Sequence, residues 1–319
     1  MNEDTADLVS VVGRFDVGRL HEHRLLEGGL INHNHWIRTS RGEWLLRGYP
    51  SDRTESEVRF ELSVLDRLGR AGVPGPVPVP SRTGEPFTRS ADGALCSLLS
   101  FVPGRGGTRS DLTAELAYES GAMYARVRRA LEGFTPDGSH ERADGEQVAP
   151  LVADLVARLP GHVARLLDRA WRSVAPRFAA TPDDRFAVVH GDLYYANMIL
   201  DDAGRLVAFI DYDDAYVGDT VLDLATLVME MATPHTAIVP ELASAVLSGY
   251  GDRPPTGLLL DAIIFQHCKF LCYTVELSGT LDGIEDNDYY QRLVLLMADG
   301  HLERLEKELV GQTSSSAGR

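Results

Sequence analysis

The sequence predicts an α+β protein in two lobes, a small antiparallel sheet followed by a larger and mainly helical part. Two observations indicate this division. Short apolar runs at 36–39 and 44–47 flank a Ser-Arg-Gly turn, which is typical of a β-hairpin. From about residue 112, apolar residues instead recur at helical spacing over long stretches. A chain of 319 residues is long enough to bury a sizeable core in two such parts.

The N-terminal lobe is predicted over 1–101. Helical spacing of apolar residues predicts one helix over 4–17 and another over 54–69. The proline-dense run 71–80 forces an extended segment after the second helix. Residues 94–101 predict a buried strand, which ends at a Val-Pro-Gly turn. We therefore place a hinge between the lobes at about residues 100–104.

The C-terminal lobe is predicted over 105–310. Apolar periodicity predicts its helices at 112–131, 151–174 with a break near Pro160, 221–231, 259–277 and 289–309. Segment 135–147 is polar and contains Pro and Gly, which predicts a mobile loop. The Ser-rich residues 311–319 predict a disordered tail.

Charge and cysteine content exclude several classes of protein. The formal net charge of -16 argues against binding to nucleic acid or to an anionic membrane surface, both of which require basic protein surface. It permits a cationic small substrate. Three cysteines indicate a reducing compartment, and Cys268 and Cys272, beside His267, are interpreted as buried thiols rather than a zinc site. With no signal peptide or membrane span visible, we expect a cytoplasmic monomer or homodimer.

The most informative stretch runs over 188–215. His190-Gly191-Asp192 follows an apolar entry, and Asn197 comes five residues after Asp192. A short hairpin pattern then leads to Asp211. An Asp followed by an Asn at this spacing, with a further Asp beyond a hairpin, is the arrangement of the kinase phosphoryl-transfer site.

These motifs resemble the aminoglycoside phosphotransferase, choline kinase and homoserine-kinase-like superfamily, the small-molecule branch of the protein-kinase-like fold. That superfamily carries H-G-D-x-x-x-x-N, then I-D at the end of a strand, then G-D-x-x-x-D-[IL]-A. This chain has all three in order, the last as Gly218-Asp219 through Asp223-Leu224-Ala225. The resemblance implies a bilobal protein-kinase-like fold and phosphoryl transfer from ATP or GTP with Mg²⁺.

The resemblance also implies roles for individual residues. Asp192 would orient and deprotonate the acceptor hydroxyl, and Asn197 and Asp211 would hold Mg²⁺ through hard oxygen atoms. His190 is interpreted as a structural brace, Asp213 as a local residue beside the metal ligand, and Asp223 as the group that holds the catalytic-loop backbone.

On the nucleotide side, Arg47 occupies the position where the superfamily usually has Lys, and its fork can hold phosphate. Glu61 is the expected partner of Arg47, with Glu55 and Glu57 as competing choices. The backbone of Ser100, Phe101 and Val102 matches the adenine-contacting hinge. Gly28 and Gly29 predict either a phosphate-binding loop or a simple hairpin turn.

Other features favour a small-molecule acceptor. Tyr194 stands where protein kinases place a Lys, and Tyr212-Asp213 follows Asp211 where they have Phe-Gly. The acceptor itself stays open between an aminoglycoside-like antibiotic and an amino-alcohol metabolite. An acidic loop is either a receptor for cationic amino groups or a solvated surface; its residues are Asp282, Glu285, Asp286 and Asp288.

Two other functions compete with the kinase hypothesis. A Mg-dependent phosphatase would use Asp192 and Asp211 but would not need Arg47, Glu61 or the hinge. A non-catalytic nucleotide-binding scaffold would not need the catalytic and metal-binding side chains that this chain retains.

Overall fold

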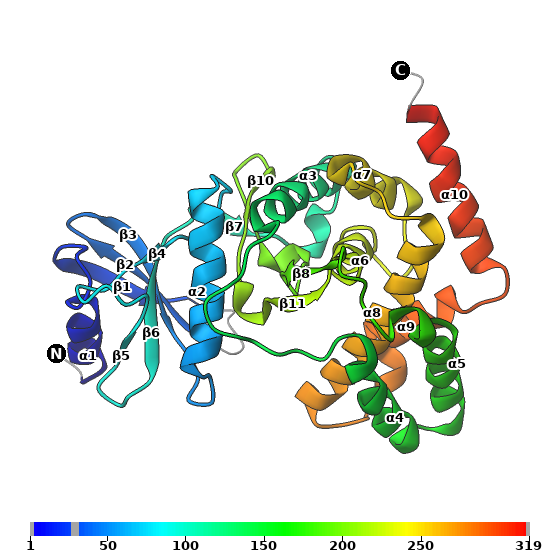
Figure 1. Ribbon diagram of the computed structural model, residues 1–319, viewed down its shortest axis with the longest axis horizontal. Coiled ribbons are helices and arrows are strands. Elements are labelled where there is room, and N and C mark those ends of the chain that lie inside the picture. Colours follow the sequence, from blue (N-terminus) through cyan, green and yellow to red (C-terminus); the bar gives the residue numbers. More distant parts are fainter. Residues whose placement is uncertain (1–2, 27–31, 317–319) are drawn as a thin grey trace.

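The computed structural model describes residues 3–26 and 32–316, and it has the two predicted lobes (Figure 1). The N-terminal lobe is an antiparallel sheet in the order β1-β2-β3-β6-β4, with β5 paired to β6. Its strands are β1 (Leu20–Leu25), β2 (His33–Thr39), β3 (Gly42–Gly48), β4 (Pro78–Val79), β5 (Thr88–Arg89) and β6 (Leu95–Ser100). The hairpin predicted from 36–39 and 44–47 is confirmed as β2 and β3.

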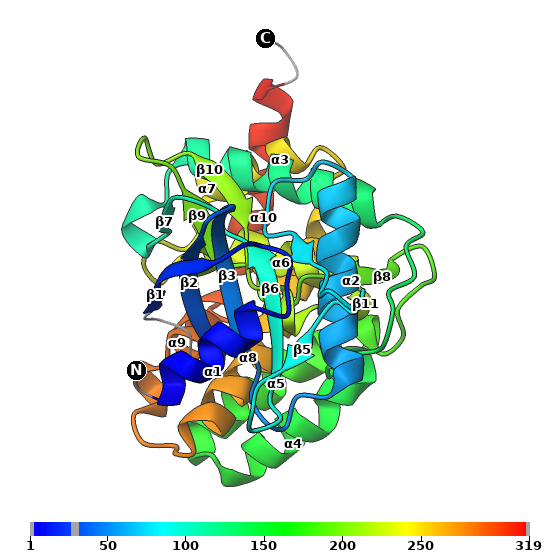
Figure 2. The ribbon, with the colours of Figure 1, turned by 90° about the vertical axis from the view of Figure 1, so that its left-hand side faces the viewer.

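One helix covers each face of this sheet (Figure 2). Successive side chains of a strand point to opposite faces, so Leu46 of β3 packs with α1 (Glu3–Val12) while Leu45 contacts the core on the other face. That second face carries α2 (Glu55–Arg70), which begins at a capping box formed by Thr54 and Glu57. The same alternation places Arg47 on the α2 side.

The C-terminal lobe is mainly helical. Its helices are α3 (Ala114–Leu131), α4 (Ala149–Arg158), α5 (Gly161–Phe178), α6 (Thr220–Met231), α7 (Pro240–Tyr250), α8 (Thr256–Ser278), α9 (Asp288–Leu296) and α10 (His301–Ser316). α8 packs against α6, α5 and α9. By length and composition α8 is the one helix in the described part of the chain that could cross a membrane, and most of it is buried inside the protein. It is therefore the core helix predicted from its sequence.

Two strand pairs on the C-terminal lobe frame the central stretch. β9 (Met198–Leu200) pairs antiparallel with β10 (Leu206–Phe209), as predicted, and with the connector strand β7 (Arg105–Gly106). β8 (Phe186–Val189) pairs antiparallel with β11 (Tyr216–Asp219). The loop between β8 and β9 carries Asp192, and the short 3₁₀ turn Tyr212–Asp214 follows Asp211.

Two sequence predictions need correction. The helix predicted over 289–309 is two helices, because Gly300 takes a left-handed conformation (φ 67°) between α9 and α10. The tail predicted to be disordered from Gly311 is helical as far as Ser316, where α10 continues without a Pro to end it. Helix α7 was not predicted.

Candidate active site

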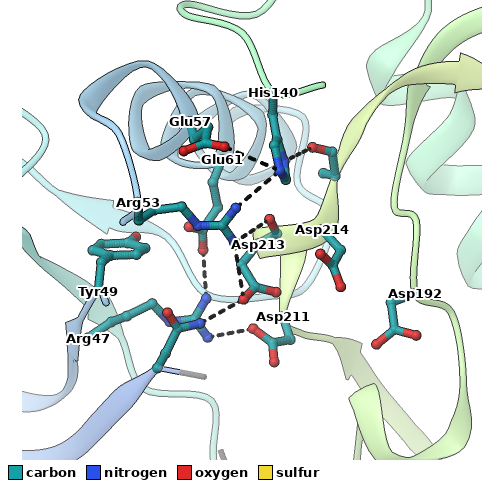
Figure 3. A network of polar contacts seen from close by, with 12 residues as sticks. Arg47, Tyr49, Arg53, Glu57, Glu61, His140, Asp192, Asp211, Asp213 and Asp214 are labelled. Atoms are coloured by element: carbon teal, nitrogen blue, oxygen red, sulfur yellow. Dashed lines mark hydrogen bonds and ion pairs between the residues drawn. The ribbon is translucent and has the colours of Figure 1, made fainter. Parts of the chain in front are cut away.

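Arg47 joins the two lobes through its guanidinium. Its Nη1 donates to Oε1 of Glu61 on α2 at 2.7 Å, and its Nη2 lies 2.8 Å from Oδ1 of Asp211 on the C-terminal lobe (Figure 3). Arg47 is 4% exposed and Glu61 is 2% exposed, so water does not screen this contact. Burial raises the pKa of Glu61 to about 7 against the opposing field of Arg47. One buried side chain thus connects the sheet, α2 and the turn after β10.

The other two candidate glutamates on α2 point elsewhere. Glu55 pairs with Arg89, and Glu57 belongs to the capping box with Thr54. Of the three candidates, only Glu61 contacts Arg47.

Asp192 and Asn197 lie in the loop between β8 and β9, which we call the catalytic loop, and they are joined by hydrogen bonds. Nδ2 of Asn197 donates to both the backbone oxygen and Oδ2 of Asp192, each at 2.9 Å. Burial raises the pKa of Asp192 to about 7, although the Asn197 hydrogen bond favours the ionised form. A carboxyl group that titrates near neutral pH is suited to accept a proton from a hydroxyl.

Backbone hydrogen bonds fix this loop from below. The two oxygens of Asp223 accept the N–H groups of His190 and Gly191, each at 3.0 Å. The Nε2 of His190, buried beneath the loop, lies 3.1 Å from the carbonyl oxygen of Ile210, just before Asp211. Gly191 (φ +86°) approaches the Asp214 carbonyl so closely that a Cβ would lie 2.3 Å from it. The catalytic loop and the turn after Asp211 are therefore in direct contact.

Asp211 has an unusual backbone. It is the one non-glycine residue with positive φ in the described ranges, at φ 66° and ψ 66°. Such a conformation costs on the order of 1 kcal/mol, so surrounding contacts must hold it. Burial raises the pKa of Asp211, and the Arg47 guanidinium opposes this rise. The N–H of Ile210, just before Asp211, donates to the Asn197 carbonyl at 2.9 Å, and Figure 3 shows the side chains of Asp211 and Asp192 in the same part of the site.

The donor set at this point fits a hard divalent cation. Both side-chain hydrogen bonds of Asn197 are made by Nδ2, which leaves its Oδ1 for a cation; Asp211 adds carboxylate oxygens. In the described part of the chain, no group of three or more His, Cys, Asp or Glu side chains is arranged to hold a metal ion. Two protein ligands completed by phosphate oxygens are typical of Mg²⁺ in phosphoryl transfer.

The predicted hinge lies at the end of β6. The Ser100 N–H donates to the Val77 carbonyl at 2.8 Å, and the Ser100 hydroxyl accepts from the Val77 N–H at 2.9 Å. The Phe101 N–H faces the Glu43 carbonyl at 3.4 Å. The N–H and the hydroxyl group of Ser100 are therefore both bonded to Val77, and the chain continues through Val102 into the second lobe. Gly28 and Gly29 lie outside the described residues.

The acidic loop is not brought to Arg47 and Asp211. Oε1 of Glu285 lies 3.0 Å from Nε2 of His162, and Oδ2 of Asp288 lies 2.6 Å from Nη2 of Arg109. Asp286 ends the short 3₁₀ turn Ile284–Asp286 just before them. Two of the four acidic loop residues, Glu285 and Asp288, are thus paired with basic side chains at the surface.

Sequence reasoning missed several residues around the site. Arg53, His140 and Arg142 contact the turn after Asp211, and Glu230 of α6 forms a buried ion pair of 2.8 Å with Arg292 of α9. The first three lie in loops, where no periodicity marks a side chain that points inward. The Glu230–Arg292 pair interrupts two apolar helix faces, which was the signal available for it.

Solved structures share this architecture. The chain resembles an amicoumacin kinase in complex with AMP-PNP and Ca²⁺ (TM-score 0.69, 17% identity, 98% of this chain and 94% of the other). It also resembles a microcompartment-associated aminopropanol kinase (TM-score 0.68, 19% identity, 96% of this chain and 99% of the other). The predicted bilobal kinase-like fold is confirmed.

Sequence comparison defines the family. The model of the phosphotransferase enzyme family (APH) matches residues 22–259. Homoserine kinase of Gluconobacter oxydans is 26% identical over 252 residues, which cover 78% of each chain. Homoserine kinase of Neisseria meningitidis serogroup B is 25% identical over 305 residues, covering 88% of this chain and 93% of that enzyme. The chain belongs to the phosphotransferase enzyme family, and the predicted enzyme class, a small-molecule kinase with an alcohol group as acceptor, is confirmed.

Proposed function

We propose that this protein transfers the γ-phosphoryl group of ATP or GTP, with Mg²⁺, to a hydroxyl group of a small amino alcohol. The observation that carries the proposal is the buried Arg47, whose guanidinium contacts Glu61 and Asp211 at once. A cation held at this junction can neutralise nucleotide phosphates while it fixes the position of Asp211.

Each polar side chain then has one role. Asp192 accepts the hydrogen of the acceptor hydroxyl and directs its oxygen at the γ-phosphorus. The new O–P bond forms as the bond to the nucleoside diphosphate oxygen breaks, and the proton goes to Asp192. Asn197 Oδ1 and the Asp211 carboxylate would hold Mg²⁺, which when bound neutralises charge on the phosphates. Asp223 and His190 keep the loop in place.

Two observations favour an acceptor of the homoserine type over an aminoglycoside. The curated relatives quoted above are homoserine kinases, matched over most of their length. The acidic loop, which a polycationic antibiotic would need as an open negative surface, has Glu285 and Asp288 paired with His162 and Arg109. A compact acceptor with one amino group does not require that surface.

A phosphatase is the competing function. It would need no nucleotide and hence no cation at position 47, so the buried contacts of Arg47 and Glu61 speak against it.

The test is an acceptor screen with purified enzyme and MgATP or MgGTP. L-homoserine, 1-amino-2-propanol, kanamycin and p-nitrophenyl phosphate would be compared by release of nucleoside diphosphate and by mass spectrometry of the products. We expect phosphorylated homoserine or aminopropanol. Hydrolysis of p-nitrophenyl phosphate without nucleotide, or exclusive phosphorylation of kanamycin, would contradict the proposal.

A further inference from the structure

Two residues outside the motifs contact the backbone of the turn that follows Asp211. Nη2 of Arg53 donates to the carbonyl oxygen of Asp213 at 2.8 Å. Nδ1 of His140 lies 2.8 Å from the carbonyl oxygen of Ala215. Carbonyl groups at the end of a short helical turn have no partner within the turn, so they need donors from elsewhere. Arg53 and His140 supply these donors from two different lobes.

Arg53 and His140 also bind each other. Nη1 of Arg53 lies 3.1 Å from Nε2 of His140 (Figure 3). Because the Ala215 carbonyl only accepts, His140 must carry its hydrogen on Nδ1, and Nε2 is then free to accept from Arg53. A neutral imidazole thus links Arg53, in the loop before α2, to the turn through two hydrogen bonds. His140 is 8% exposed, so water does not compete for either nitrogen.

The side chains of the turn are held from the same directions. Oδ2 of Asp213 accepts from Nδ2 of the buried Asn32 at 2.7 Å and lies 3.5 Å from Nη2 of Arg53. Asp214 forms an ion pair with Arg142, two residues beyond His140. The strained Asp211 backbone is therefore followed by three residues whose positions are fixed by groups from both lobes.

The polar segment 135–147 packs on α2 and thereby places His140 and Arg142 at the turn. The N–H of Ser139 donates to Oγ of Ser56 at 2.9 Å, and the N–H of Asp137 donates to Oγ of Ser63 at 3.0 Å. His140 also contacts the ring of Phe60 edge-on at 6.4 Å. The segment predicted as a mobile loop is thus tied along one helix of the other lobe.

We propose that Arg53 and His140 are positioning residues of the phosphoryl-transfer site, which hold the turn after Asp211 so that its carboxylate faces Asn197 and Asp192. This inference rests on the proposed function for the role of Asp211, but its structural part does not. Arg53 and His140 touch no reacting atom and act only through the backbone of the turn.

The experiment compares four variants with the wild type. Arg53→Met and His140→Phe each remove one link. His140→Gln restores one donor and one acceptor in a side chain that does not titrate. Ser139→Ala is the matched control, because it removes the hydroxyl contact with Ser56 but touches nothing at the turn.

The first readout is hydrogen–deuterium exchange of peptide 212–216 in the enzyme without nucleotide or metal. Arg53→Met and His140→Phe should each accelerate exchange of this peptide about tenfold, because the turn opens more often. Each should also lower kcat about 10–100-fold, as loss of groups that orient a metal ligand does. His140→Gln and Ser139→Ala should stay within about threefold of the wild type in both measurements.

A double variant completes the design. Since both residues act in one chain of contacts, Arg53→Met combined with His140→Phe should be no more than about threefold worse than the poorer single variant. The proposal would be overturned if the effects of the two substitutions multiplied in the double variant, or if exchange were unchanged in the single variants. An effect of Ser139→Ala equal to theirs would also overturn it. Exchange is measured without substrate, so its outcome is separate from failure of the proposed function, which Asp192→Asn tests.

Discussion

At the junction of the lobes the side chains of Arg47 and Glu61 are 5% and 3% exposed, whereas those of Glu285 and Asp288 are 61% and 56% exposed. Both regions contain ion pairs of similar length, yet their energetics differ. Removing one partner of a buried pair costs about 3–5 kcal/mol, while an exposed pair contributes about 0–1 kcal/mol. The comparison teaches that the junction of the lobes is fixed by buried contacts, and that the acidic loop can vary without disturbing it.

The strongest contrast should appear in catalysis. Asp211→Ala is expected to lower kcat by at least about 100-fold, since even residues that only orient a metal ligand contribute about 10–100-fold. Asp202→Asn, in the exposed turn of the same hairpin, is the matched control and should leave kcat unchanged. Steady-state kinetics with MgATP and the best acceptor measures both. If Asp211→Ala kept its activity, Asp211 would not be a metal ligand.

Stability should show the next largest difference. Arg47→Met leaves Glu61 buried without its cation, which should cost about 3–5 kcal/mol in the free energy of unfolding. Arg38→Met breaks the exposed pair with Glu22 on the neighbouring strand, and such pairs are worth about 0–1 kcal/mol. Urea denaturation of the two variants compares them directly. Equal losses in the free energy of unfolding would mean that the buried junction contributes no more to stability than an exposed ion pair on the sheet.

Acid should destabilise the C-terminal core. Burial lowers the pKa of His267 to about 3. The unfolded chain binds a proton below about pH 6.5 that the folded chain does not, so stability falls as pH drops from 6.5 towards 3. From neutral pH to pH 5 this amounts to about 2 kcal/mol. His267→Gln should flatten that slope in urea titrations; an unchanged slope would assign acid sensitivity to other groups.

The smallest effects should come from the acidic loop. Asp288→Asn breaks the contact with Arg109 and should change the acceptor KM by no more than about fivefold, since exposed charge contacts contribute at most about 1 kcal/mol. Its kcat and its KM for nucleotide should stay at the wild-type values. A loss of kcat comparable to that of Asp211→Ala would show that the two regions form one site.

The same contrast explains how far the sequence could be interpreted. Motif spacing brought Asp192, Asn197 and Asp211 together, because a loop and a hairpin of fixed length leave few other arrangements. The family resemblance marked Arg47 as the strand cation and Glu61 as its expected partner, with Glu55 and Glu57 as competing choices. Residues from irregular segments could not be found this way: Arg53 and His140 meet only after both lobes have folded, and no local pattern encodes a contact 87 positions apart.

The fold showed the same limit. Periodic patterns predicted the long helices, but the break between α9 and α10 contains a left-handed glycine at position 300, and a glycine inside a helical pattern is ambiguous. The short strands β8 and β11 pair across more than 25 residues of chain, so their pairing follows from tertiary structure.

The central claim is that Asp192 accepts the hydrogen of the acceptor hydroxyl, and Asp192→Asn tests it most directly. Asn keeps the size of the side chain but cannot take up a proton. With MgATP and the phosphorylated acceptor quantified by mass spectrometry, kcat should fall by about 10²–10⁴-fold, while the KM for ATP should stay within about threefold. Phosphorylation of the acceptor by Asp192→Asn at the wild-type rate would contradict the account.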